Sequence, residues 1–353
     1  MDNIEKRIKG FVKLGEFLGQ FTKTDFHEKA HVAHNDLFFE PFKDKIALAR
    51  QKNGWFTREN IGYALTQWSD LLKAENLHAW LGRYPYKEVS PRQVAVIMAG
   101  NIPLAGFHDF LSVLLTGHAV TVKLSSADEV LLPFLAWYLE QAEPYFKGKI
   151  DFTREPLRNF DAVIATGSNN TARYFDYYFG KKPNIIRRNR NSAGVLSGNE
   201  STEQLAALGE DIFTYYGLGC RNVSKLFVPE DYDFSAFFKA IYSYHLIINH
   251  EKYANNYDYN KAVYLMSSFA ILENGFLMLK EDESYAAPIA TVFYEYYDNY
   301  NTLKAKLEAD SDKIQCIVAG GFKEEEVPFG KSQQPRLWEY ADGVDTVDFL
   351  LKI

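Results

Sequence analysis

The chain has 353 residues, a formal net charge of -7 and two cysteines. This length exceeds the roughly 250–300 residues at which a single core stops growing, so we expect two domains. The negative charge argues against general nucleic-acid binding, and the two cysteines are too few for a disulfide framework and suit a reducing compartment. No apolar run approaches the ~20 residues of a membrane span, and the N-terminus lacks the apolar core of a signal peptide, so we expect a cytoplasmic protein.

The sequence up to about residue 85 predicts a mostly helical region. Apolar side chains recur there at helical spacing and share one face of a helix. They are Ile61, Leu65, Trp68, Leu71 and Leu72.

Three histidines invite a metal hypothesis, because His27, His31 and His34 share a face if residues 27–34 form a helix. Two histidines four residues apart on a helix can bind the same zinc ion. No cysteine or carboxylate partner is identifiable, and a surface helix that carries histidines explains the same pattern. We therefore assign no metal.

From residue 94 onward, predicted strands and helices alternate. The strands are 94–99, 120–124, 162–166 and 184–188, and the helices are 103–116, 131–142 and 171–179. Such alternation implies parallel strands, and hence an α/β fold with a Rossmann-like cofactor domain. The usual G-x-G-x-x-G fingerprint is missing, and the clearest punctuation is the Ser/Gly/Asn-rich stretch from Asn191 to Ser201.

Asn101 lies where the first of these strands ends, in VAVIMAGNIPLAG (94–106). Pro103 suits the first turn of the helix that follows, and Gly117 suits its end. Ligands bind at the carboxyl ends of strands in open α/β sheets, and an amide there can donate to a developing oxyanion. Alternatively, Asn101 only caps the helix.

A basic cluster, Arg187, Arg188 and Arg190, follows the last predicted strand. It could meet the phosphates of a ligand, but charge runs are more often the solvated end of a strand.

Cys220 lies in GLGCRNVSKLFV (217–228), where Arg221 and Lys225 flank the thiol. Cations lower the pKa of a thiol, and glycines allow a substrate carbonyl to approach the sulfur. The alternative is a buried structural cysteine. Cys316, inside the apolar run IQCIVAGG, is interpreted as a core strand residue.

Taken together, these segments resemble the aldehyde dehydrogenase superfamily, and more closely its LuxC-like fatty acyl-CoA reductase branch. The order of motifs carries the resemblance: AGNIP (99–103), VTVKLSS (120–126), ATGS (165–168), GLGC (217–220), ESYAAPIATVFY (283–294) and VPFGKSQ (327–333). WFTRENIGYAL (55–65) and EYADGVDTVDFLL (339–351) look specific to the acyl-CoA reductase branch.

The resemblance implies three regions. These are an N-terminal helical region with a dinucleotide-binding domain (1–190), an α/β catalytic domain (191–335) and a closing or oligomerisation segment (336–353). It implies Cys220 as nucleophile and Asn101 as oxyanion donor. It places a nicotinamide cofactor on Lys123, Ser125, Ser126, Gly167, Ser168 and Glu283. Free N–H groups of a helix that begins near Thr171 would favour the cofactor phosphates.

The chemistry implied is reduction of an acyl-CoA, or of an acyl carrier, to an aldehyde. Oxidising relatives use a glutamate to activate water, whereas the matching stretch here, NIIRRNRNSAGVLSG (184–198), has no carboxylate. An acyl-cysteine without such a base should persist long enough to accept hydride.

NADPH is preferred over NADH, because NAD-preferring relatives carry an acidic residue where this chain has Ser126. NADH remains an alternative cofactor. Structurally, Lys123 could instead only extend its amine to solvent from the strand end.

Two other functions stay open: an acyl-phosphate reductase similar to γ-glutamyl phosphate reductase, and a non-catalytic subunit that hands acyl groups to a partner protein. The resemblance also implies a homo-oligomer, with residues 344–351 as a candidate strand that pairs across its interface.

Overall fold

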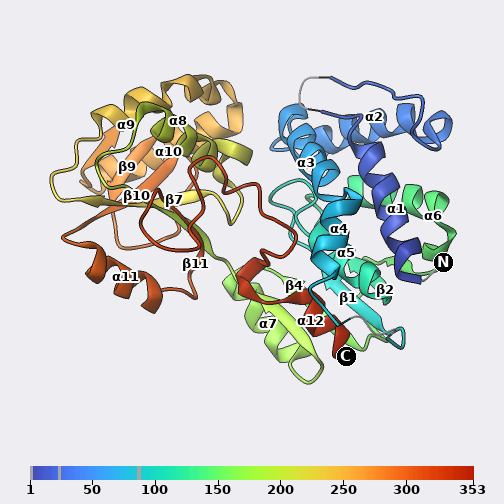
Figure 1. The fold of residues 1–353 in the computed structure, drawn as a ribbon. Coiled ribbons are helices and arrows are strands. Elements are labelled where there is room, and N and C mark those ends of the chain that lie inside the picture. Colours follow the sequence, from blue (N-terminus) through green and yellow to red (C-terminus); the bar gives the residue numbers. More distant parts are fainter. Residues whose placement is uncertain (1–2, 23–24, 86–88) are drawn as a thin grey trace. The chain divides into compact units, whose positions relative to one another are not determined.

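The computed structural model describes residues 3–22, 25–85 and 89–353, and the chain forms two compact units (Figure 1). Unit 1 comprises Met1–Arg188 and Arg336–Ile353, and unit 2 comprises Asn189–Pro335. Among the described residues, no helix combines the length and apolarity that crossing a bilayer requires.

Unit 1 opens with helices, as the sequence predicts. They are α1 (Asn3–Leu18), α2 (Asn35–Lys52), α3 (Arg58–Leu71) and α4 (Ala74–Leu81). Helix α3 begins after Thr57, whose hydroxyl accepts a hydrogen bond from the backbone N–H of Asn60. The predicted apolar face of α3 is confirmed, because Ile61, Leu65 and Leu72 are fully buried in the core of this unit.

The helix expected over residues 27–34 is wrong, because these residues form turns and extended backbone between α1 and α2. Hydrogen bonds to the buried amide of Gln20 hold this segment in place of the backbone hydrogen bonds of a helix. Its oxygen accepts from the Lys29 N–H at 2.8 Å and from the Asn35 amide at 2.8 Å. The three histidines therefore do not share a helical face.

A five-stranded parallel sheet forms the centre of unit 1. Its strands are β1 (Gln93–Ile97), β2 (Ala119–Lys123), β3 (Ile150–Phe152), β4 (Ala162–Thr166) and β5 (Asn184–Arg187), in the order β3-β2-β1-β4-β5. The helices between them are α5 (Phe107–Thr116), α6 (Leu131–Ala142) and α7 (Asn169–Phe179). Every pairing in this sheet is parallel, which confirms the predicted α/β alternation.

Helix α5 begins at Phe107 rather than at residue 103, and Pro103 lies in the turns before it. Leu104 interrupts the helix, because its φ of 59° is left-handed. The buried carboxylate of Asp128 accepts a hydrogen bond from the Leu104 N–H at 2.7 Å and holds this turn. Gly117 ends α5 with φ 102°, as expected of a glycine there.

Residues 344–351, expected to pair as a strand across a dimer, instead form α12 (Thr346–Leu351) in unit 1. Asp345 caps this helix by accepting from the Asp348 N–H at 2.9 Å. Val347 and Leu350 are buried in the core of unit 1, so the amphipathic pattern is used within the chain.

A second, six-stranded sheet forms unit 2, in the order β11-β6-β7-β10-β9-β8. Its strands are β6 (Asn191–Val195), β7 (Val223–Pro229), β8 (Ile271–Glu273), β9 (Met278–Glu281), β10 (Thr291–Tyr297) and β11 (Ile314–Val318). The helices are α8 (Thr202–Phe213), α9 (Ser235–Ala240), α10 (Glu251–Met266) and α11 (Tyr300–Ala309). Only the edge pair β8–β9 is antiparallel among the described pairings.

The Ser/Gly/Asn-rich stretch from Asn191 to Ser201 contains a strand. Its first half is strand β6, which lies between β11 and β7 and is almost entirely buried. Small residues allow close packing around β6. At Gly194, for example, a Cβ would come within 2.8 Å of the Leu226 side chain.

Candidate active site

The oxyanion donor and the cofactor residues predicted in unit 1 lie at one edge of its sheet. Asn101 follows β1, Lys123 ends β2 with Ser125 and Ser126 behind it, and Gly167 and Ser168 follow β4. Strand order reverses between β1 and β4, since β2 and β3 extend the sheet to one side of β1 and β5 extends it beyond β4. Ligands of open α/β sheets bind at such a switch point, at the carboxyl ends of the strands.

The turn that carries Asn101 is tightly packed. A Cβ on Gly100 would come within 2.7 Å of the Ser125 side chain, so glycine is required for this approach. Beneath the turn lies Asp128, and burial raises the pKa of its carboxyl to about 6. Asn101 itself is exposed and stands ahead of Gly106, the residue that caps α5. It is therefore not the cap of that helix.

Both carboxylates in the segment that follows β2 are engaged by other groups of the chain. Asp128 is turned inward to the Leu104 N–H, and the Glu129 carboxylate pairs with Lys52 and Arg154. The Lys123 amine donates to the Glu155 carbonyl at 3.3 Å, while Ser126 is exposed.

Ser168 is the N-cap of α7, and its hydroxyl accepts from the Thr171 N–H at 3.2 Å. The helix begins at Asn169 rather than near Thr171. Gly167 lies against it, because a Cβ there would come within 3.1 Å of the Thr171 side chain. The first turn of α7 thus points its remaining backbone N–H groups beyond the end of β4.

The three arginines do not form a solvated cluster. Arg187 is buried and pairs with the buried carboxylate of Asp109, and it also donates to the Thr346 hydroxyl at 2.9 Å. Arg188 pairs with Asp176 at 2.9 Å. In unit 2, Arg190 donates to the Ser311 carbonyl at 3.1 Å.

Cys220 is exposed and lies on a loop between α8 and β7. Backbone strain marks this loop, since Tyr215 and Tyr216 have φ of 55° and 59° and Gly217 has φ of 78°. A cysteine that only filled space in the core would not require a strained loop. The exposed thiol therefore excludes the alternative of a buried structural cysteine.

Asn222 fixes the loop from inside. Its buried side-chain oxygen accepts from the Gly219 N–H at 2.7 Å, and its amide donates to the Thr214 carbonyl at 2.8 Å and to the Asp211 carbonyl at 3.0 Å. A Cβ on Gly219 would come within 2.9 Å of that oxygen, so this glycine admits the contact.

Asp211 ties the nucleophile loop to residues 327–333. Its buried carboxylate accepts from the Gly330 N–H at 2.6 Å and the Ser332 N–H at 2.8 Å, and burial raises the pKa of this carboxyl. Arg221 donates to the Ser332 carbonyl at 3.3 Å. Next to Gly219 lies the amide of Gln333, whose nitrogen is buried and makes no hydrogen bond within the described part of the chain.

Cys316 is half-buried on β11 and is linked to the nucleophile loop through Ser192. The Ser192 hydroxyl donates to the Cys220 carbonyl at 3.1 Å and lies 3.0 Å from the Cys316 sulfur. Cys316 is therefore a strand residue, as predicted, but it also borders the loop.

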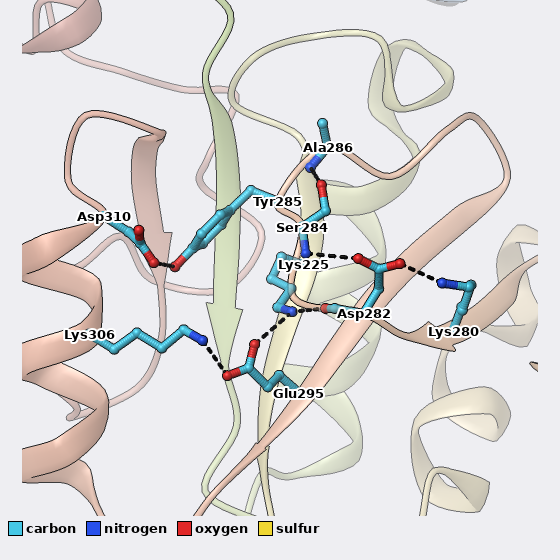
Figure 2. Close-up of polar contacts among 9 residues, drawn as sticks. All are labelled: Lys225, Lys280, Asp282, Ser284, Tyr285, Ala286, Glu295, Lys306 and Asp310. Carbon is cyan, nitrogen blue, oxygen red and sulfur yellow. Dashed lines mark hydrogen bonds and ion pairs between the residues drawn. The ribbon is translucent and has the colours of Figure 1, made fainter.

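Glu283 is exposed on residues 282–290, the segment that connects the parallel strands β9 and β10. Its neighbour Asp282 caps this segment, because its carboxylate accepts from the Ser284 N–H at 2.9 Å. Lys225, expected to influence the thiol, instead pairs with Glu295 at 3.1 Å and donates to the Asp282 carbonyl (Figure 2).

A small pocket of unit 2 lies between the nucleophile loop and the end of this segment. Its walls come from Tyr216 and Gly217 of the loop, from Val223 and Ser224 of β7, and from residues 287–291. Phe213 and Tyr253 add aromatic surface.

Sequence reasoning missed Asn222, Asp211 and Gln333. Asn222 stands two residues after the predicted nucleophile, so its position in GLGCRNV was a usable signal. Asp211 is distant in sequence from Gly330 and Ser332, and Gln333 is distant from Gly219, so no local pattern reveals that these residues lie together.

The fold of the chain is that of the aldehyde dehydrogenases. Aldehyde dehydrogenase 21 from Physcomitrella patens, solved in complex with the reaction product succinate, matches with a TM-score of 0.69 and 13% identity, covering 99% of this chain and 84% of that chain. An indole-3-acetaldehyde dehydrogenase complexed with NAD+ matches with a TM-score of 0.63 and 13% identity, covering 90% and 72%. The aldehyde dehydrogenase PutA from Anabaena variabilis matches with a TM-score of 0.61 and 14% identity, covering 91% and 76%.

The family profile of acyl-CoA reductase (LuxC) matches residues 15–245. The chain belongs to this LuxC acyl-CoA reductase family, as its motifs predict. No curated protein sequence gives a significant match.

Proposed function

We propose that this protein reduces an acyl-CoA thioester to an aldehyde, with NADPH as reductant and an acyl-cysteine on Cys220. The observation that carries the proposal is the exposed thiol of Cys220 on a strained loop that Asn222 and Asp211 immobilise, in a chain of the acyl-CoA reductase family. Preorganised loops of this kind present nucleophiles to bound carbonyl groups.

The residues of unit 1 fit a dinucleotide. The switch point offers the N-terminus of α7 for phosphates, and the carboxylates that follow β2 are held by the Leu104 N–H, by Lys52 and by Arg154. Lys123, Ser125 and Ser126 would hold that phosphate, Gly167 and Ser168 the pyrophosphate, and Glu283 of unit 2 the nicotinamide ribose. When bound, the nicotinamide supplies a hydride.

In the proposed reaction, the Cys220 thiolate forms a bond to the thioester carbon, and the C–S bond to CoA breaks. CoA leaves as a thiolate and takes up a proton. The Asn101 amide and the Cys220 backbone N–H donate to the oxygen of each tetrahedral species. After the carbon has accepted a hydride, the bond to Cys220 breaks, which returns the thiolate and releases the aldehyde.

Hydrolysis would compete with reduction if a base activated water at the acyl-cysteine. Residues 184–198 contain no carboxylate. The side chain of Arg187 in this stretch is buried against Asp109, and β6, with the sequence NSAGV, contributes no acidic side chain. The composition of this stretch supports reduction over hydrolysis.

The pocket beside the nucleophile loop reaches Gly217, and its walls combine aromatic and aliphatic side chains with the polar side chains of Ser224 and Thr291. We propose that it takes the acyl carbons next to the carbonyl.

The test is NADPH oxidation with a panel of acyl-CoAs from short to long, with trapping of the aldehyde product. One aldehyde per NADPH oxidised supports the proposal. Oxidation with an acyl phosphate but with no acyl-CoA would instead support an acyl-phosphate reductase. Cofactor binding without turnover on either class would favour a subunit that only transfers acyl groups.

A further inference from the structure

The segment that carries Glu283 is held by side chains of the strand that follows the nucleophile. Residues 282–290 connect β9 to β10 without a helix. The Ser224 hydroxyl donates to the Tyr285 carbonyl at 2.7 Å, and the Lys225 ammonium donates to the Asp282 carbonyl (Figure 2). Both donors belong to β7, which begins at Val223, directly after the Cys220 loop.

Lys225 is positioned by further charges. Its side chain is fully buried, and its ammonium lies 3.1 Å from a carboxylate oxygen of Glu295 on β10. The other oxygen of Glu295 pairs with Lys306 of α11. A buried ammonium must keep its hydrogen-bond partners, because desolvation makes an unpaired charge costly. The Asp282 carbonyl is therefore an obligatory partner.

The residues on both sides of Glu283 are also fixed by their side chains. Lys280 pairs with the Asp282 carboxylate, and the Tyr285 hydroxyl donates to the Asp310 carboxylate at 2.9 Å (Figure 2). Glu283 stands between these two anchored residues, with its own side chain exposed. The position of its backbone therefore follows from Lys225 and Ser224 of β7, together with the side-chain contacts of Lys280 and Asp310.

The nucleophile loop has separate supports. Asn222 and Asp211 hold it through α8 and residues 327–333, and neither contacts the Glu283 segment among the bonds described. Loss of the Lys225 contact should thus disturb one part of unit 2 and leave the other in place.

We propose that Lys225 is a positioning residue that sets the place of Glu283 for the cofactor and does not set the reactivity of Cys220. This inference rests on the proposed function and deepens it. In this proposal Lys225 affects the affinity for the cofactor, although it lies close to Cys220 in the sequence.

The experiment compares Lys225→Met with Lys306→Met as a matched control. Methionine keeps the length of the buried chain, and Glu295 retains Lys306 as a partner, so we expect Lys225→Met to fold. Lys306→Met removes a charge from the same network without touching residues 282–290. Three quantities are measured: the Kd for NADPH by cofactor fluorescence, the alkylation rate of Cys220 by iodoacetamide in a Cys316→Ala background, and the KM for acyl-CoA.

Lys225→Met should raise the Kd for NADPH about tenfold or more, the loss typical of one charge-assisted contact, and leave the alkylation rate within about twofold. A change in the KM for acyl-CoA would report movement of residues 287–291, which line the pocket beside the loop. Ser224→Ala should act in the same direction, with a smaller rise, and Lys306→Met should change the Kd by less than about twofold. An unchanged Kd in Lys225→Met overturns the proposal, as does an equal change in Kd and alkylation rate, which would indicate a general structural role.

Binding and alkylation need no turnover, so the inference is tested even if acyl-CoA is not reduced. A wild-type protein that binds NADPH but reduces no acyl-CoA contradicts the proposed activity alone. A tenfold rise in Kd in Lys225→Met would then still support the positioning role. Failure of the wild-type protein to bind either nicotinamide cofactor would overturn both proposals.

Discussion

In unit 1, the candidate cofactor residues all follow the carboxyl ends of neighbouring parallel strands, whereas in unit 2 the nucleophile loop precedes its strand and is held by buried side chains. Asn101, Lys123 and Ser168 need only the topology of the sheet to come to one edge. Cys220 depends on Asn222 and Asp211, which bind backbone groups of other segments.

This difference separates two ways to support a site. Residues at strand ends can be replaced with little effect on the core, because their side chains reach outward. Buried polar residues such as Asn222 serve both stability and placement, because any hydrogen bond that is lost leaves a partner unsatisfied. The predictions below test whether the two units respond to substitution in these different ways.

The largest effect is expected from Cys220→Ala. Because the thiol is exposed, its removal should leave the thermal stability and the Kd for NADPH near normal while formation of a radiolabelled acyl-enzyme is abolished. Cys316→Ala is the matched control and should still form the acyl-enzyme. If Cys220→Ala retains acyl-CoA-dependent NADPH oxidation, the proposed mechanism is wrong.

Asn101→Ala should lower turnover by about 10² to 10³ while cofactor binding and stability are retained, the magnitude typical of one oxyanion donor. The matched substitution in unit 2, Asn222→Ala, should instead lower the free energy of unfolding by roughly 1–3 kcal/mol, because it leaves buried backbone groups unpaired. The measurements are steady-state kinetics and chemical denaturation. If both variants lost stability, the two units would not differ in how they tolerate substitution.

Asp128→Asn should change how stability depends on pH. Burial raises the pKa of Asp128 from 3.8 to about 6, so the folded state disfavours the charged carboxylate. Well below pH 4 the group is protonated in both states, and stability is lost as pH rises from about 4 to about 6. At about 1.4 kcal/mol per pKa unit, the total is about 3 kcal/mol.

Asparagine at position 128 can still accept from the Leu104 N–H but does not titrate. The difference in free energy of unfolding between Asp128→Asn and wild type should therefore move by about 3 kcal/mol in favour of the variant between about pH 3 and pH 8. Denaturant titrations at several pH values measure it. A difference that does not vary with pH would show that Asp128 has an ordinary pKa.

The smallest effect on activity is expected from Lys123→Ala. It should raise the KM for NADPH but not for NADH, with a loss on the order of 1.5–3 kcal/mol for the phosphorylated cofactor, the value of a charge-assisted hydrogen bond. Lys147→Ala, at another exposed lysine of unit 1, serves as the control. Equal losses for NADPH and NADH would contradict the assignment of Lys123 to the 2′-phosphate.

Local patterns predicted most of unit 1. Residues 131–142 and 162–166 are a helix and a strand as expected, because apolar periodicity and short turns decide such elements locally. The start of α5 could not be predicted in the same way, since Leu104 is held by Asp128 from a later part of the chain. The turn over residues 27–34 depends in the same manner on Gln20.

The candidate site was predictable in its residue types rather than in its supports. Exposed Cys220 and Asn101 follow from motifs, but the pairing of Lys225 with Glu295 and the Asp282 carbonyl depends on the parallel register of β7 and β10. Sequence alone placed that ammonium beside the thiol. A strand residue five positions away can instead point to a different segment.

The discontinuity of unit 1 has a consequence for how the protein is made. Helix α12 belongs to unit 1, where the Leu350 carbonyl meets the ring of His118 at 2.8 Å and Thr346 accepts from Arg187. Residues 336–353 leave the ribosome only after all of unit 2, at about 5–20 residues per second. Unit 1 therefore cannot complete its core until the segment that follows unit 2 has been made, whereas unit 2 is contiguous in sequence.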